Sequence, residues 1–206
     1  MTVAEDWQPA VGDDAASPFR RRLLDGLAAS IGERGYRDTT VADIVRHART
    51  SKRTFYGEFS SKEECFVELL WSSNQEMIAK IRDAVDPEAD WREQIRQAVH
   101  AWVADIEAHP AVNLSWIREL PALGHDVREM QRRGMAGIID MFIDVSNNPG
   151  FRRAGIAPIG QQMAVLLFGG LRELSALTVE DGADVREIVD TAVAGSIAIV
   201  GAGRAD

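Results

Sequence analysis

The stretch GYRDTTVADIVRHARTSKRTFYGEFSSKEECF, residues 35–66, decides the fold of the N-terminal part of the chain. Thr40 and Asp43 have the spacing of a capping box ahead of an apolar pair, so a short helix is predicted to begin there. A second short helix is predicted over about residues 50–56, after the turn at residues 47–49. Two short helices joined by such a turn have the dimensions of a helix-turn-helix.

Charge is distributed unevenly along the chain. The formal net charge is -9, yet residues 17–62 contain ten Lys and Arg against five Asp and Glu, so this segment carries +5 and the remainder -14. A basic segment joined to an acidic remainder indicates that only the N-terminal part meets a polyanion. A helical bundle with a solvated basic face would have the same composition, and this alternative stays open.

The residue types in the second short helix suit DNA. Hydroxyls and cations at a helix N-terminus contact phosphates, and a side chain from the same turn reaches base edges in the major groove. Phe55 and Phe59 are expected to face inward, because a three-helix unit this small needs its rings for its core.

The quoted stretch resembles the N-terminal signature of TetR-type transcriptional repressors. It matches that signature in register at Gly35, Tyr36, Thr39, Thr40, Ile44, Ala48, Ser51, Lys52, Thr54, Tyr56, Phe59, Lys62 and Glu63. The resemblance implies an all-α protein, with an N-terminal three-helix helix-turn-helix DNA-binding domain and a C-terminal helical ligand-binding and dimerisation domain.

The rest of the chain also favours helices. Apolar residues recur at spacings of three and four between turn signals, and alternating strand patterns are absent. We expect about nine helices, a disordered tail at residues 1–16, the helix-turn-helix DNA-binding domain at residues 17–64, and the effector-binding and dimerisation domain at residues 65–206.

The resemblance assigns roles at the DNA residue by residue. Phosphate contacts are implied for Thr40, Ser51, Lys52, Tyr56 and Lys62. Arg53 and Thr54 would lie nearest the bases, and Thr50 would serve either role. Tyr56 could instead be partly buried against the first helix. The arginines at residues 20–22 would approach the flanking minor groove or form a solvated first helical turn.

The chain departs from the TetR signature at Arg49 in the turn, at Thr50, which replaces an apolar residue, and at Arg53 in the recognition helix. Arg49 stands where the family usually has glycine, and a positive φ there would strain an arginine. We therefore expect an adjusted turn, with Arg49 as an additional cation near phosphate. Arg53 also replaces a common glycine and could pair with a guanine edge.

The last two predicted helices are rich in small and apolar residues. Family resemblance places a dimeric four-helix bundle on them, and the expected interface residues are Gly169, Gly170, Leu174, Ala192, Gly195 and Ile199. The alternative is that these small residues pack helices within one chain.

The middle helices are rich in rings and thioethers, and the resemblance implies an effector pocket there. The candidate effector-binding residues are Met77, Trp102, Trp116, Glu119, Met135, Phe142 and Phe168. Such a set suits an elongated or aromatic hydrophobic ligand. Ordinary core packing is the alternative for each of them.

Other functional classes find little support. The four histidines lack metal-ligand spacing, and no Gly-rich phosphate loop or serine elbow occurs, so we expect no enzyme, no metal and no cofactor. Cys65 is expected to be an apolar filler and not a redox sensor. No apolar run approaches about 18 residues and no signal peptide is evident, which favours a cytoplasmic protein without a membrane partner.

The sequence therefore predicts a DNA-binding transcriptional regulator. The expected form is a homodimeric repressor on a palindromic double-stranded DNA operator, released by a small hydrophobic effector. The alternative function is a helical small-molecule-binding protein without sequence-specific DNA binding.

Overall fold

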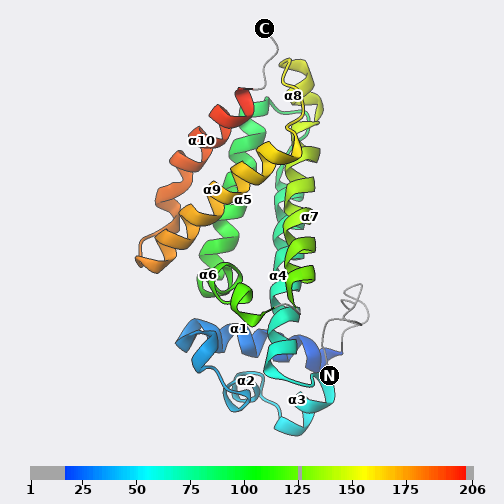
Figure 1. Cartoon of the computed structure of the whole chain (residues 1–206), viewed down its shortest axis with the longest axis vertical. Coiled ribbons are helices and arrows are strands. Elements are labelled where there is room, and N and C mark those ends of the chain that lie inside the picture. The colour runs from blue at the N-terminus through cyan, green and yellow to red at the C-terminus, as the bar shows by residue number, and fades with distance from the viewer. Residues whose placement is uncertain (1–16, 125–126, 203–206) are drawn as a thin grey trace. The chain divides into compact units, whose positions relative to one another are not determined.

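The computed structural model describes residues 17–124 and 127–202. Within these residues the chain forms helices and no strand (Figure 1). The helices are α1 (Pro18–Asp38), α2 (Val41–His47), α3 (Lys52–Glu58), α4 (Lys62–Ala84), α5 (Trp91–Ala108), α6 (Pro110–Arg118), η1 (Leu120–Leu123), α7 (Arg128–Ser146), α8 (Pro149–Arg153), α9 (Gln161–Glu180), η3 (Val185–Ile188) and α10 (Val189–Gly201). The all-α class is confirmed, and the described residues contain ten α-helices where about nine were expected. The predicted tail at residues 1–16 lies outside the described residues.

Contacts divide the chain into two compact units, which we describe separately. Unit 1 comprises the chain up to Asn74 together with residues 109–132, and unit 2 comprises residues 75–108 and those from Arg133 onward. Helix α4 contributes its first part to unit 1 and its second part to unit 2. This division by contacts does not test the functional boundary between residues 64 and 65, which stays a prediction.

Unit 1 contains the three-helix arrangement of α1, α2 and α3. Phe55 and Phe59 are 0% and 1% exposed, which confirms that both rings face inward. Helices α1 and α2 approach closely at Gly26, where a Cβ atom would lie 2.7 Å from the carbonyl oxygen of Ile44. Helix α1 bends at Gly35, whose φ of 78° is accessible to glycine at little cost.

Unit 2 is built mainly from α5, α7, α9 and α10. Helix α10 packs against α5 and α9 (Figure 1). Helix α8 was not anticipated, because Asn147–Gly150 has the composition of a turn, yet Pro149 opens a short helix. The start of α8 is fixed beside α5, since the Gln94 side chain donates to the Ala89 carbonyl at 2.9 Å and accepts from Asn148 at 2.8 Å.

Candidate nucleic-acid interface

Side-chain caps define both helices of the helix-turn-helix. The hydroxyl of Thr40 accepts from the backbone N–H of Asp43 at 3.3 Å, and the Asp43 carboxylate accepts from the backbone N–H of Thr40 at 3.0 Å. The predicted capping box is therefore confirmed. Ser51 caps α3, with its hydroxyl accepting from the N–H of Thr54 at 3.1 Å.

Arg49 lies in the turn between α2 and α3 with a φ of 50°. Our expectation of an adjusted turn was wrong, because the backbone keeps the left-handed conformation that glycine adopts most easily. Arg22 of α1 explains how the turn is held: its guanidinium donates to the carbonyl oxygens of Ala48 at 2.5 Å and of Arg49 at 2.8 Å. Arg22 is therefore tied to the turn, which neither interpretation of residues 20–22 anticipated.

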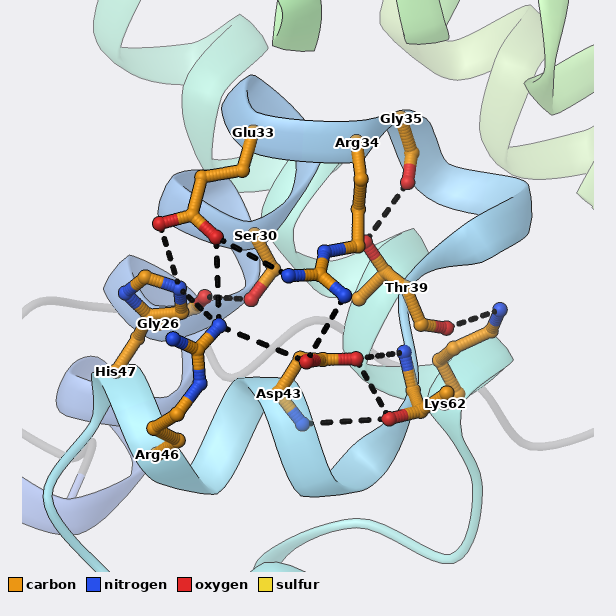
Figure 2. A network of polar contacts seen from close by, with 11 residues as sticks. Gly26, Ser30, Glu33, Arg34, Gly35, Thr39, Asp43, Arg46, His47 and Lys62 are labelled. Atoms are coloured by element: carbon orange, nitrogen blue, oxygen red, sulfur yellow. Dashed lines mark hydrogen bonds and ion pairs between the residues drawn. The ribbon is translucent and has the colours of Figure 1, made fainter.

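A network of ion pairs joins α1 to α2 (Figure 2). Glu33 of α1 lies 3.3 Å from Arg46 and 3.2 Å from the His47 ring of α2. Arg34 pairs with Asp43 at 3.2 Å. Three of these five side chains are cationic or can become so, and both acids lie between them.

The two carboxylates of this network are stabilised in their charged forms. Hydrogen bonds from the side chain and backbone of Thr40 lower the pKa of Asp43, and Arg34 and Arg46 add to the effect. Desolvation raises the pKa of Glu33, but hydrogen bonds from His47, Arg46 and Arg34 outweigh it, so the net direction is down. The network thus fixes α2 against α1 when both acids are ionised.

Most cations of the basic segment already have partners within unit 1. Arg20 forms an ion pair with Glu68 and Arg37 one with Glu119, the latter at 2.9 Å. Lys62 donates to the carbonyl oxygens of Tyr36 and Thr39, at 3.1 and 2.9 Å. Lys62 was expected at a phosphate, and in this arrangement it holds the end of α1.

Three neighbouring cations of the basic segment differ from its other cations, because their side chains have no intramolecular partner among the described residues. Arg49, Lys52 and Arg53 are exposed, and no ion pair or side-chain hydrogen bond of theirs occurs within the described part of the chain. All three lie in the turn or the first turn of α3. The charge that is available to a partner is therefore concentrated where a helix-turn-helix meets DNA.

The remaining predicted DNA-binding residues lie around these cations. Tyr56 is 59% exposed, so burial against the first helix is not what the structure shows. Thr50 and Thr54 are half-buried and Ser51 is exposed. Thr40 donates its hydroxyl hydrogen to Asp43 at 2.7 Å, so a phosphate would have to compete with that carboxylate.

The sequence of this region matches a known family. The profile described as bacterial regulatory proteins, tetR family, matches residues 23–69, which include α2, the turn and α3. This helix-turn-helix domain belongs to the TetR family.

Two curated relatives match part of the chain. The chain is 39% identical over 92 residues to the HTH-type transcriptional repressor KstR2 of Mycobacterium tuberculosis, covering 45% of this chain and 46% of that protein. It is 31% identical over 88 residues to the HTH-type transcriptional activator FasR of Mycolicibacterium smegmatis, covering 43% of this chain and 40% of that protein. The chain thus spans about half the length of the curated relatives it matches.

A solved structure shares the fold over a longer span. The regulator FadR from Bacillus subtilis, solved in complex with stearoyl-CoA, superposes with a TM-score of 0.73 at 16% identity, over 87% of this chain and 97% of that one. At this identity the likeness shows the fold alone.

A cavity lies in unit 2, outside the TetR-type domain. It holds about 70 Å³ and is lined by side chains of α4, α5, α7, α8, α9 and α10. Four predicted effector-binding residues line it: Met77, Trp102, Phe142 and Phe168. Met135 is half-buried against the core of unit 2, and Trp116 and Glu119 belong to unit 1. The sequence therefore identified four of the lining residues and missed the two serines there, Ser146 and Ser196.

The predicted dimer residues lie on α9 and α10. Gly169, Gly170 and Gly195 are exposed, Leu174 and Ile199 are half-buried, and Ala192 is 2% exposed within its own chain. Helix α9 also exposes four large apolar side chains, at 39 to 61% of their surface: Met163, Val165, Leu166 and Leu177. Among the described helices, α9 is long and apolar enough to cross a membrane, by length and composition only. The sequence pattern did not indicate such a run. A single helix of this kind is weak evidence for a membrane span, because core helices of soluble proteins have the same length and composition.

Cys65 of α4 is 0% exposed. Burial raises the pKa of its thiol, so the reactive thiolate is disfavoured. This environment supports the interpretation of Cys65 as an apolar filler.

Proposed function

We propose that the protein is a DNA-binding transcriptional regulator whose α3 enters the major groove. The observation that carries the proposal is that, among the described cations of residues 17–62, Arg49, Lys52 and Arg53 have no ion pair or side-chain hydrogen bond, and that they lie close together in the turn and the start of α3. The TetR-type domain and the two relatives that are named as transcription regulators support it.

Within this proposal the three cations have different tasks. Lys52 lies at the first position of α3 and neutralises a phosphate, which contributes affinity without sequence preference. Arg53, one position further, reads a guanine edge, a contact that discriminates by about 1 to 3 kcal/mol against other bases. Arg49 adds a phosphate contact from the turn.

Two copies of the chain are needed for tight binding. One helix-turn-helix contacts only one half-site, and dimers bind half-sites about 34 to 36 Å apart on a palindromic operator. We propose the exposed face of α9, with α10, as the dimer surface. Its apolar side chains would be covered by the same face of a second copy.

A hydrophobic effector would act through unit 2. Met77 and Ile81 of α4 line the cavity, while the first turns of the same helix belong to unit 1. An effector shifts the protein only if it binds the DNA-incompetent conformation more tightly. We propose that a ligand in the cavity tilts α4 and thereby changes the spacing of the two recognition helices. We propose that the protein represses transcription in the cytoplasm and that this ligand relieves the repression.

An electrophoretic mobility shift series tests DNA binding. The probe is the DNA upstream of the protein's own gene, and the salt concentration is varied. Lys52→Ala should weaken binding and reduce the slope of log affinity against log salt by about 1, because one phosphate contact is lost. The matched control is Arg37→Ala, which removes another exposed cation, one that is paired with Glu119.

The outcomes separate the proposal from its alternatives. If Arg37→Ala lowers the salt slope as much as Lys52→Ala, the basic face acts only as a diffuse charge. If the wild-type protein shows no salt-dependent binding to any DNA but binds hydrophobic compounds, the protein is a helical small-molecule-binding protein instead.

A further inference from the structure

The cavity in unit 2 is lined by apolar side chains, with two exceptions. Among the described residues of its lining there is no Lys, Arg, Asp, Glu or His, and the polar groups are the hydroxyls of Ser146 and Ser196 and the indole N–H of Trp102. A charged ligand group placed inside would lose its water and find no counter-ion. The cavity therefore favours uncharged ligand groups over charged ones.

The hydroxyls of the two serines differ in their hydrogen bonding. The hydroxyl of Ser146 donates to the carbonyl oxygen of Ile143 at 2.8 Å and accepts from the N–H of Ile159 at 3.0 Å. The hydroxyl of Ser196 is buried and has no hydrogen-bond partner among the described residues, and the residue is 4% exposed. Ser196 is thus the lining serine whose hydroxyl can still bind a polar atom of a ligand.

Other serines in helices show how unusual this is. Ser30 donates to the carbonyl of Gly26 at 2.8 Å, and Ser175 to that of Arg172 at 2.8 Å. A serine inside a helix commonly satisfies its hydroxyl in this way. A buried hydroxyl without a partner costs free energy, and a ligand atom that hydrogen-bonds to it recovers that cost.

We infer that the cavity binds an uncharged apolar ligand, or the uncharged part of a larger one, through one hydrogen bond to Ser196. This inference rests on the proposed function for the location of the effector. The chemical class is an alkyl or ring compound with a single alcohol, ketone or ester group. A carboxylate or phosphate inside the cavity is disfavoured, because no cationic side chain is among the described residues of its lining.

The size of the cavity limits the ligand further. A volume of about 70 Å³ admits only a small group, whereas ligand pockets commonly hold roughly 300 to 1,000 Å³. A larger ligand has to displace half-buried side chains such as Met77, Phe142 and Leu171. Methionine suits this because its unbranched side chain repacks easily.

The test uses hexan-1-ol and hexanoate as probes on the full chain. Their dissociation constants are measured at pH 7 by NMR titration, and the indole resonance of Trp102 reports on the cavity. Hexan-1-ol should bind at least tenfold more tightly than hexanoate. Ser196→Ala should weaken the binding of hexan-1-ol about five- to tenfold, as expected for the loss of one hydrogen bond.

Ser175→Ala is the matched control, because it removes a buried hydroxyl that does not line the cavity. It should lower the midpoint of thermal unfolding, since the hydrogen bond from Ser175 to the Arg172 carbonyl is lost, and leave hexan-1-ol binding unchanged. Ser196→Ala should leave that midpoint unchanged or raise it, which shows that the variant is folded.

The inference is overturned if hexanoate binds as tightly as hexan-1-ol, if Ser196→Ala binds hexan-1-ol like the wild type, or if hexan-1-ol does not bind. Failure of the proposed function looks different. In that case hexan-1-ol binds in a Ser196-dependent manner, but the protein does not bind DNA under any condition.

Discussion

The guanidinium of Arg22 donates a 2.8 Å hydrogen bond to the carbonyl oxygen of Arg49, the one non-glycine residue with a positive φ among those the structure describes. A side chain from α1 thus holds the strained position of the turn that precedes the recognition helix. Strain at such a position persists only where surrounding contacts fix it. The conformation of the turn and the contact from α1 can be tested separately.

Arg49→Gly should raise the free energy of unfolding by up to about 1 kcal/mol, because glycine adopts a positive φ without steric cost. Urea titration of the full chain measures the change. Arg53→Gly is the matched control and should lower the free energy of unfolding, since glycine weakens a helix by up to about 1 kcal/mol. Equal destabilisation by both substitutions would show that Arg49 is not strained.

Arg22→Met should loosen the turn without unfolding the domain. The backbone N–H of Thr50 donates to the Val45 carbonyl at 3.0 Å across the turn, so its hydrogen exchange reports on turn opening. Loss of the guanidinium contacts should accelerate that exchange about tenfold. This corresponds to a decrease of roughly 1.4 kcal/mol in the free energy of turn opening. Exchange of the Phe59 amide, which donates to Phe55 at the far end of α3, is the internal control. Unchanged exchange at Thr50 would mean that Arg22 does not hold the turn.

Gly26→Ala should destabilise the DNA-binding domain by about 1 to 3 kcal/mol, as overpacking in a core does. The added Cβ atom would meet backbone atoms at the end of α2 and just after it, at 2.7 Å from the Ile44 carbonyl oxygen and 3.0 Å from the Ala48 nitrogen. Gly32 on the same helix has no atom within 4 Å of an added Cβ. Gly32→Ala should therefore be neutral or stabilising by up to about 1 kcal/mol. Thermal unfolding compares the two, and a similar loss in both would argue against the close approach.

Local patterns predicted the part of the structure that depends on local chemistry. The capping box at Thr40 and Asp43 is a short-range arrangement, and the sequence located it. The start of α3 was predicted to within about two residues, since the helix begins at Lys52 after the cap at Ser51. The inward rings of Phe55 and Phe59 followed from the need of a small domain for a core.

Long-range contacts escaped prediction. The Arg22 hydrogen bonds join residues 26 and 27 positions apart, and no periodic pattern encodes them. Lys62 was expected at DNA by resemblance, while its contacts to the end of α1 depend on the folded arrangement. The unpaired hydroxyl of Ser196 is likewise visible only once the surrounding helices are placed.

The network of Glu33 and Asp43 predicts how stability depends on pH. The pKa of Glu33 is lowered from its ordinary 4.5 and that of Asp43 from 3.8, so both favour the folded form when ionised. Their contribution is fully present above about pH 4.5 and is lost as pH falls through the lower folded values. In urea titrations between pH 5 and 3, the free energy of unfolding should fall more steeply for the wild type than for Glu33→Gln. Parallel curves would show that Glu33 does not contribute.

Leu166→Glu should dissociate the proposed dimer. Leu166 is 61% exposed on α9, and a carboxylate there would be buried beside its symmetry copy, which costs far more than the lost apolar contact. Sedimentation velocity should show a dimer for the wild type and a monomer for the variant. Phe19→Glu is the control, because Phe19 is also a large exposed apolar residue, 47% exposed, but lies on α1. A dimer that survives Leu166→Glu, or one lost equally in Phe19→Glu, would refute the assignment of the dimer surface to α9.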